Sequence, residues 1–175
     1  MNTEEYFTEI ERSTQHAYAV AKLAKAVGID PVADVEVPIA MTLAEKTVGL
    51  ISTMYPQLQD KRIVDRILEL EQEHGALNIA VAFIIAEEIA RERYCKFESL
   101  LQAIEGGIRV GFAYVTIGVV SSPLEGFTEL QLGKTRDGKE YFKAYFSGPI
   151  RSAGTTASCV VLMLIDYLRE AFGYA

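Results

Sequence analysis

The sequence predicts a mostly helical α+β domain that contains one β-hairpin and is preceded by a helical arm. Apolar residues recur at helical spacing through most of the 175-residue chain, and beyond Pro123 the period changes to two. Prolines also oppose helix continuation between residues 29 and 38. We therefore expect a helical arm with an extended connector over residues 1–38. Residues 39–175 should form a helical domain with a hairpin at about 127–147.

Each helix is predicted from its start, its stop and its apolar spacing. Asn2 and Glu5 can form a capping box at the start of the first helix, and Gly28 can end it. The remaining helices are expected at residues 41–54, 59–74, 76–94, 97–116 and 154–172. The last of these begins apolar on all sides, so we expect it to be buried, with the others packed around it.

Three glycines fall inside the predicted 97–116 helix, at Gly106, Gly107 and Gly111. Each weakens a helix by about 1 kcal/mol relative to alanine, so each needs a reason to be there. Close packing of another helix at Gly111 is the favoured explanation. The alternative is the close approach of a ligand.

The hairpin is predicted from two alternating segments, 127–134 and 139–147, on either side of a turn at residues 135–138. One face of the second strand alternates aromatic and basic side chains, namely Tyr141, Lys143 and Tyr145. Tyrosines interleaved with lysine can stack on the bases of single-stranded nucleic acid and neutralise its phosphates. The alternative is an ordinary amphipathic face, half covered by a helix or by other domains.

A loop of small and polar residues connects the hairpin to the last helix. Its candidate anion-binding residues are Arg151, Ser152, Gly154 and Thr156. A helix start leaves N–H groups unpaired and carries partial positive charge, so such a loop can hold an anion. A nucleotide-hydrolysing P-loop is excluded because the glycine spacing is wrong and the lysine is missing. The alternative is a tight strand-to-helix turn with a threonine cap.

Composition limits the possible functions. The net charge of −7 argues against a dedicated nucleic-acid-binding module. Residues 1–105 hold 18 acidic and 10 basic residues, whereas residues 106–175 hold 6 and 7, so any surface that faces DNA should lie in the second part. We expect a soluble cytoplasmic protein with no membrane partner, because no signal peptide is visible and the apolar runs are short. Cys95 and Cys159 are expected to be free thiols without a zinc partner.

Three segments resemble motifs of one known family. Residues 148–154 read Gly-Pro-Ile-Arg-Ser-Ala-Gly, residues 118–126 read Gly-Val-Val-Ser-Ser-Pro-Leu-Glu-Gly, and residues 34–38 read Asp-Val-Glu-Val-Pro. All three are similar to motifs of the large subunit of archaeal family D DNA polymerase (DNA polymerase II), and they occur in its order. The resemblance covers about residues 34–173. Thr155 stands where that family usually has a second glycine.

The resemblance implies that the chain is the N-terminal domain of a much longer large subunit that continues beyond residue 175. The parent would be a replicative DNA-directed DNA polymerase that needs Mg²⁺ and carries structural Zn²⁺ elsewhere. Its catalytic aspartate pair would lie far downstream. This sequence has no Asp-x-Asp and no carboxylate cluster, so we expect no catalytic residue, metal site or cofactor within it.

The resemblance also implies the partners. They are the remainder of the large subunit, a small subunit that supplies 3′-to-5′ exonuclease activity, and primer-template DNA bound through the parent; self-association is a further possibility. Two alternatives stay open at the level of sequence. One is a pure scaffold that docks subunits without contacting DNA. The other is a free-standing protein that binds a phosphorylated ligand.

Overall fold

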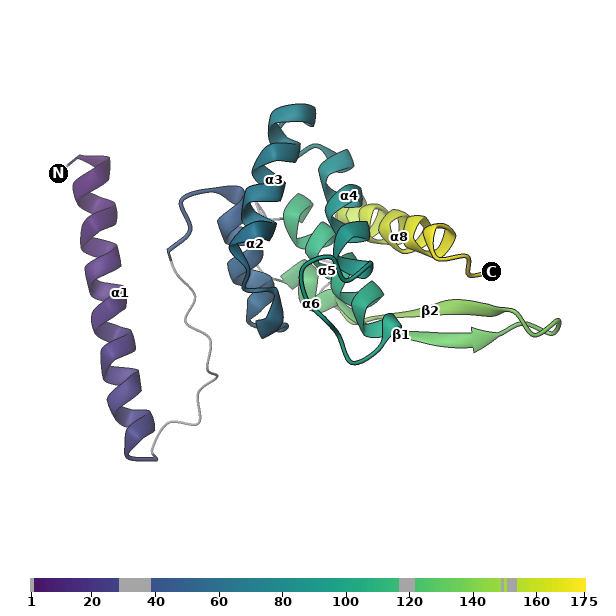
Figure 1. Cartoon of the computed structure of the whole chain (residues 1–175), viewed down its shortest axis with the longest axis horizontal. Coiled ribbons are helices and arrows are strands. Elements are labelled where there is room, and N and C mark those ends of the chain that lie inside the picture. The colour runs from purple at the N-terminus through teal and green to yellow at the C-terminus, as the bar shows by residue number, and fades with distance from the viewer. Residues whose placement is uncertain (1, 29–38, 117–121, 149, 151–153) are drawn as a thin grey trace. The chain divides into compact units, whose positions relative to one another are not determined.

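The computed structural model describes residues 2–28, 39–116, 122–148, 150 and 154–175. The chain divides into two compact units, Met1–Ile39 and Ala40–Ala175. The described residues are mostly helical and include a two-stranded antiparallel sheet (Figure 1). The predicted class, a helical α+β fold with one hairpin, is therefore confirmed.

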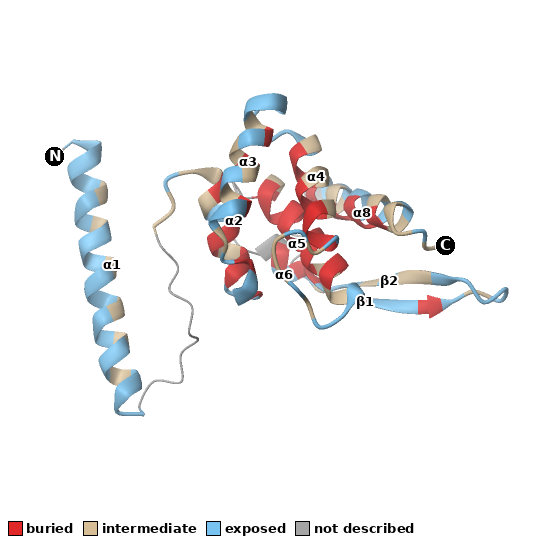
Figure 2. Ribbon diagram, in the orientation of Figure 1, coloured by how far each residue is buried: buried red, intermediate tan, exposed pale blue. Residues whose placement is uncertain are grey.

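The first unit consists of one long helix, α1 (Thr3–Ala26). The predicted capping box is present, since Glu5 N donates to the Asn2 side chain at 2.8 Å and Asn2 N donates to the Glu5 carboxylate at 2.9 Å. Gly28 adopts φ +75° just beyond the helix. None of the residues of α1 is buried (Figure 2). The predicted connector at residues 29–38 lies outside the described residues.

The second unit contains the remaining elements. Its described helices are α2 (Leu43–Ser52), the 3₁₀ helix η1 (Pro56–Leu58), α3 (Lys61–His74), α4 (Ile79–Ala90), α5 (Leu100–Thr116), α6 (Ser122–Gly126) and α8 (Gly154–Ala171). Two of them begin three residues later than the sequence predicts. The Asn78 side chain caps α4 by accepting from Ala80 N at 2.9 Å, and the Ser99 side chain accepts from Gln102 N at 3.2 Å at the start of α5. These polar side chains set the starts, which the apolar pattern alone does not mark.

The centre of the second unit is α5, which corrects the expectation that the last helix is central. Twelve of the 17 residues of α5 are buried. In α8 burial follows one face only, and Leu162 and Met163 are about half exposed (Figure 2). The apolar residues on all sides of α8 are therefore not enough to bury the whole helix. Gly107 and Gly111 let α5 approach α4 closely.

Gly107 and Gly111 explain the close contact between α4 and α5. A Cβ atom at Gly107 would lie 2.3 Å from the carbonyl oxygen of Ala86, and one at Gly111 would lie 2.7 Å from that of Ala82. Both distances are too short for a real side chain. The prediction of helix packing at Gly111 is confirmed, and Gly107 serves the same purpose one turn earlier.

The sheet pairs β1 (Phe127–Lys134) with β2 (Glu140–Phe146). Gly138 supplies φ +85° in the turn, and its N–H donates to the Thr135 carbonyl at 3.1 Å. One face carries apolar pairs, including Leu130 opposite Ala144 and Leu132 opposite Phe142. The hairpin extends away from the helices, with the C-terminus beside it (Figure 1).

We predict that Gly107→Ala destabilises the protein although alanine favours helices. The new methyl group meets a backbone carbonyl, so α4 and α5 must separate, and overpacking of this kind costs about 1–3 kcal/mol. Gly106→Ala is the matched control, because its nearest atom is the Phe97 side chain at 3.0 Å, which can move. Urea unfolding of the 175-residue chain measures both variants. If the Gly107→Ala variant is as stable as the unmodified chain, this account is wrong.

Candidate functional site

The candidate site is built on a buried ion pair in α5. Arg109 donates to the Glu105 carboxylate from Nε at 3.1 Å and from Nη2 at 2.9 Å. The side chain of Arg109 is only 4% exposed and that of Glu105 only 18%. The remaining guanidinium hydrogens point to backbone carbonyls of the next segment, those of Leu124 (3.3 Å), Phe127 (2.7 Å) and Thr128 (2.7 Å). One arginine thus holds the end of α6 and the start of β1.

Glu105 extends this network to two further elements. Its carboxylate accepts from Leu130 N at 3.0 Å, in β1, and from the Tyr55 hydroxyl at 3.0 Å, before η1. Burial, together with the Glu105 charge, raises the pKa of Tyr55 to about 12. The guanidinium of Arg109 also lies 4.8 Å from the centre of the Phe127 ring. The base of the hairpin is therefore fixed to α5 by charge-assisted hydrogen bonds.

Two of the motif segments meet at the base of the hairpin. Ser147 N donates to the Gly126 carbonyl at 2.8 Å, and the Ser147 hydroxyl donates to the Glu125 carbonyl at 3.1 Å. A Cβ at Gly126 would lie 2.6 Å from Ile150 N, so no other residue fits there. Gly126, at the end of the 118–126 segment, and Ile150, near the start of the 148–154 segment, are thus side by side.

The predicted anion loop is described in part. Arg151 and Ser152 lie outside the described residues. Gly154 is the first residue of α8, and Thr156 is exposed in its first turn. The Ser158 hydroxyl donates to the Ile150 carbonyl at 3.4 Å. A helix start in general carries partial positive charge, and the anion-binding interpretation of this loop relies on that property of α8.

The second predicted surface lies on the hairpin. Tyr141 is opposite Gly133, and a Cβ on that glycine would meet the Tyr141 ring at 2.6 Å and Lys143 Cε at 2.5 Å. The Tyr141 ring and the Lys143 stem therefore lie flat across β1. Lys143 Nζ is 5.8 Å from the centre of the Tyr141 ring, and the Tyr145 hydroxyl donates to the Gln131 side chain at 3.2 Å. The three predicted residues share one face, as the alternation requires.

Sequence reasoning missed Glu105 and Arg109. The available signal was an acidic and a basic residue four positions apart in an otherwise apolar, glycine-rich helix. Surface helices often carry such pairs, so the spacing does not reveal burial. The carbonyls that Arg109 binds become its partners only when the hairpin folds back onto α5.

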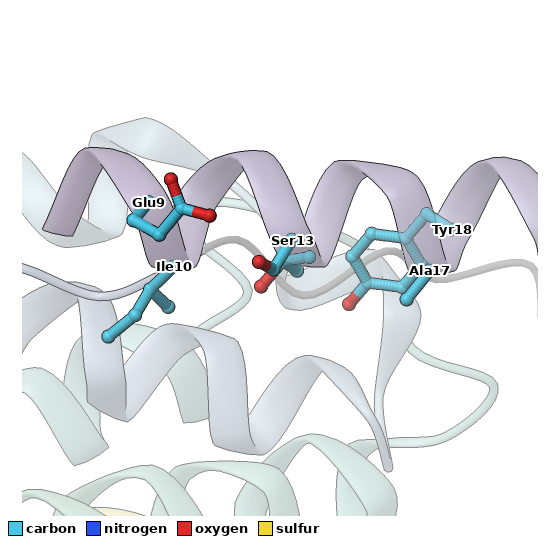
Figure 3. A pocket seen from close by; sticks show the side chains of 6 residues that line it. Glu9, Ile10, Ser13, Ala17 and Tyr18 are labelled. Carbon is cyan, nitrogen blue, oxygen red and sulfur yellow. The ribbon is translucent and has the colours of Figure 1, made fainter. Parts of the chain in front are cut away.

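Among the described residues, a hollow beside α1 is lined by Glu9, Ile10, Ser13, Thr14, Ala17 and Tyr18 of that helix (Figure 3). In the described part of the chain, no three His, Cys, Asp or Glu side chains gather where they could hold a metal ion. No helix there has the length and apolar character needed to cross a membrane. Cys95 and Cys159 are free thiols.

We predict that Glu105→Gln lowers the stability of the chain by about 3 kcal/mol, since it leaves the buried Arg109 without its counter-charge. Asp166→Asn is the control. Asp166 pairs with Arg169 at 2.8 Å on the exposed side of α8, where an ion pair contributes little. Chemical denaturation followed by circular dichroism measures both. A Glu105→Gln midpoint equal to that of the control would show that the pair is dispensable.

Comparison with known proteins agrees with the motifs. A family model described as "DNA polymerase II large subunit DP2, N-terminal" matches residues 5–175. The chain is 37% identical over 168 residues to the DNA polymerase II large subunit of Nanoarchaeum equitans, which covers 96% of this chain and 14% of the relative. The same protein of Methanothermobacter thermautotrophicus is 37% identical over 171 residues, covering 97% and 15%. That of Thermococcus kodakarensis is 35% identical over 170 residues, covering 96% and 9%.

The chain therefore spans about 14% of the length of the first of these relatives. The match runs through nearly all of this chain, and it includes both segments that meet at the base of the hairpin. The chain belongs to the family of archaeal DNA polymerase II large subunits and corresponds to their N-terminal part.

Proposed function

We propose that this chain is a non-catalytic N-terminal domain that helps to assemble a two-subunit replicative DNA polymerase. The parent synthesises DNA on a template with Mg²⁺ bound elsewhere, and its small subunit supplies 3′-to-5′ exonuclease activity. The relatives are all named as large subunits, which supports a small-subunit partner. The observation that carries the assembly role is α1, a helix of 24 residues with none of them buried.

Helix α1 has the side chains for docking but gains little stability by itself. Isolated helices are marginal in water, and most helix stability in proteins comes from a packed apolar face. Four large apolar side chains of this segment are exposed by 48–71%, namely Tyr6, Val20, Leu23 and Val27. Full burial of each contributes about 1.5–3 kcal/mol. A partner surface within the polymerase supplies that burial: the remainder of the large subunit, the small subunit or a second copy of this domain.

A contact with DNA phosphate is the second role that we propose. The loop residues Arg151, Ser152, Gly154 and Thr156 bind a backbone phosphate at the start of α8. The supporting observation is the junction of the two motif segments, where Gly126 packs against Ile150 and fixes the chain just before the loop. The loop also lies in residues 106–175, the part of the sequence that is not net acidic.

We predict that deletion of residues 1–28 leaves the core from about residue 40 to 175 folded, with a nearly unchanged thermal midpoint. The reason is that α1 contributes no buried residue. In the full-length large subunit the same deletion should weaken assembly with the small subunit or self-association, measured by analytical ultracentrifugation. Leu23→Ser combined with Val27→Ser should reproduce the loss. Met41→Ser, which changes an equally exposed residue of the second unit, is the control. If the deletion unfolds the core, α1 belongs to the domain and the docking role fails.

We predict that Arg151→Ala in the assembled polymerase weakens primer-template binding and makes its salt dependence shallower. The slope of log K against log salt changes by about 0.9 for each duplex phosphate contact that is lost. Fluorescence anisotropy at several salt concentrations measures both quantities. Lys96→Ala is the control, because Lys96 is 82% exposed and far along the sequence from the loop. A variant with unchanged DNA binding and a lower melting temperature would mean that Arg151 is structural, and the scaffold role would stand alone.

A further inference from the structure

We propose that the hairpin binds single-stranded DNA, with bases stacked on Tyr141 and Tyr145 and phosphates held by Lys143 and the basic turn. This inference rests on the proposed role in a DNA polymerase, but it uses a different surface from the loop before α8. We call the side of the sheet that carries Tyr141, Lys143 and Tyr145 the tyrosine face. Stacking on aromatic side chains beside a positive groove is how proteins bind unpaired strands without sequence preference.

The opposite side of the sheet packs in large part against the domain itself, although Leu132 and Phe146 on that side are 37% and 38% exposed. Phe127 is fully buried and Leu130 nearly so. The Phe142 ring lies 4.6 Å from that of Tyr174, and Ala175 N donates to the Glu140 carbonyl at 2.8 Å, so the C-terminal residues cover the middle of that side. The tyrosine face consequently points away from the packed side, and Tyr145 is 44% exposed on it.

The geometry of the tyrosine face suits flat ligands. Gly133 has no side chain, so the Tyr141 ring lies against the strand instead of standing upright. Lys143 follows on the same face between the two tyrosines, and its side chain is exposed. The hydrogen bond from Tyr145 to Gln131 fixes the second ring. Two aromatic rings with a cation between them match the alternation of base and phosphate along one strand.

The charge of the hairpin tip also favours nucleic-acid binding. Residues 133–143 hold four basic side chains (Lys134, Arg136, Lys139 and Lys143) and two acidic ones, in a chain with a net charge of −7. One of the acids, Asp137, is held by Lys139 at 3.4 Å and by the Thr135 hydroxyl at 2.6 Å, and the Thr135 hydrogen bond leads the interactions that lower its pKa. Within the described residues, Lys134, Arg136 and Lys143 have no acidic partner at salt-bridge distance. The tip is thus a local basic patch.

The same observations favour a single strand over a duplex. The bases of a duplex are stacked inside it, so their faces are closed to tyrosine, whereas every unpaired base offers one. A duplex also carries a higher charge density, which the acidic remainder of the chain repels more strongly. Stacking on the tyrosines thus selects the single strand, and the basic side chains add attraction to its phosphates.

Tyrosine fluorescence can report on binding, because the chain contains nine tyrosines and no tryptophan whose emission would mask theirs. Oligo-dT is titrated into the 175-residue chain, and both tyrosine fluorescence and the anisotropy of labelled DNA are measured. We expect quenching on binding, and binding weakened about fivefold or more for Tyr141→Leu and for Tyr145→Leu. Tyr141→Phe and Tyr145→Phe should bind oligo-dT as tightly as the unmodified chain does, because the aromatic ring is kept. Tyr6→Leu in α1 is the control.

The salt dependence of binding distinguishes the contribution of the basic side chains from that of stacking. Lys143→Gln should reduce the slope of log K against log salt by about 0.7, the value for one single-strand phosphate, and Lys61→Gln in α3 should leave it unchanged. Melting temperatures of all variants exclude unfolding as the cause. The inference is overturned if the leucine variants bind oligo-dT normally or if duplex DNA of equal length binds as tightly. Binding lost only with Arg151→Ala would overturn it too, while leaving the phosphate-contact proposal intact.

Discussion

The buried pair of Glu105 and Arg109 is the interaction on which the second unit depends. A guanidinium taken out of water must find partners for all its hydrogens, and Arg109 finds them in one carboxylate and three carbonyls. Those carbonyls belong to the end of α6 and the start of β1. Because Arg109 must bind these carbonyls, it fixes the place where the hairpin leaves the helices. An apolar residue at position 109 would make no such hydrogen bonds.

Glycines make this arrangement sterically possible. Gly107 and Gly111 bring the backbone of α5 against that of α4, and Gly126 brings the end of α6 against Ile150. The first contact sets the depth of α5 in the core. The second places the residue before the loop next to Glu125 and Gly126. The end of the motif at residues 118–126 therefore contacts Ile150 of the motif at residues 148–154, although the two are distant in sequence.

The two proposed contact regions of the second unit depend on the same junction. The loop before α8 and the tyrosine face of the hairpin both begin where Ser147 bonds to Gly126. Their chemistry differs, however, since one offers N–H groups and an arginine to a phosphate and the other offers aromatic rings to a base. In the first unit, α1 contributes a third kind of surface, an exposed apolar one suited to another protein.

The sequence by itself determined the local features of this protein. The Asn2 and Glu5 capping box, the Gly138 turn and the two faces of the hairpin all follow from interactions within a few residues, so local patterns identify them. The three motifs likewise identified the family. Tertiary structure decided which helix is central, because burial depends on what a helix packs against: α5 carries the glycines that permit close approach, whereas α8 is exposed at Leu162 and Met163. It also decided the role of Arg109, whose carbonyl partners lie 15 to 19 residues away and meet it only in the folded chain.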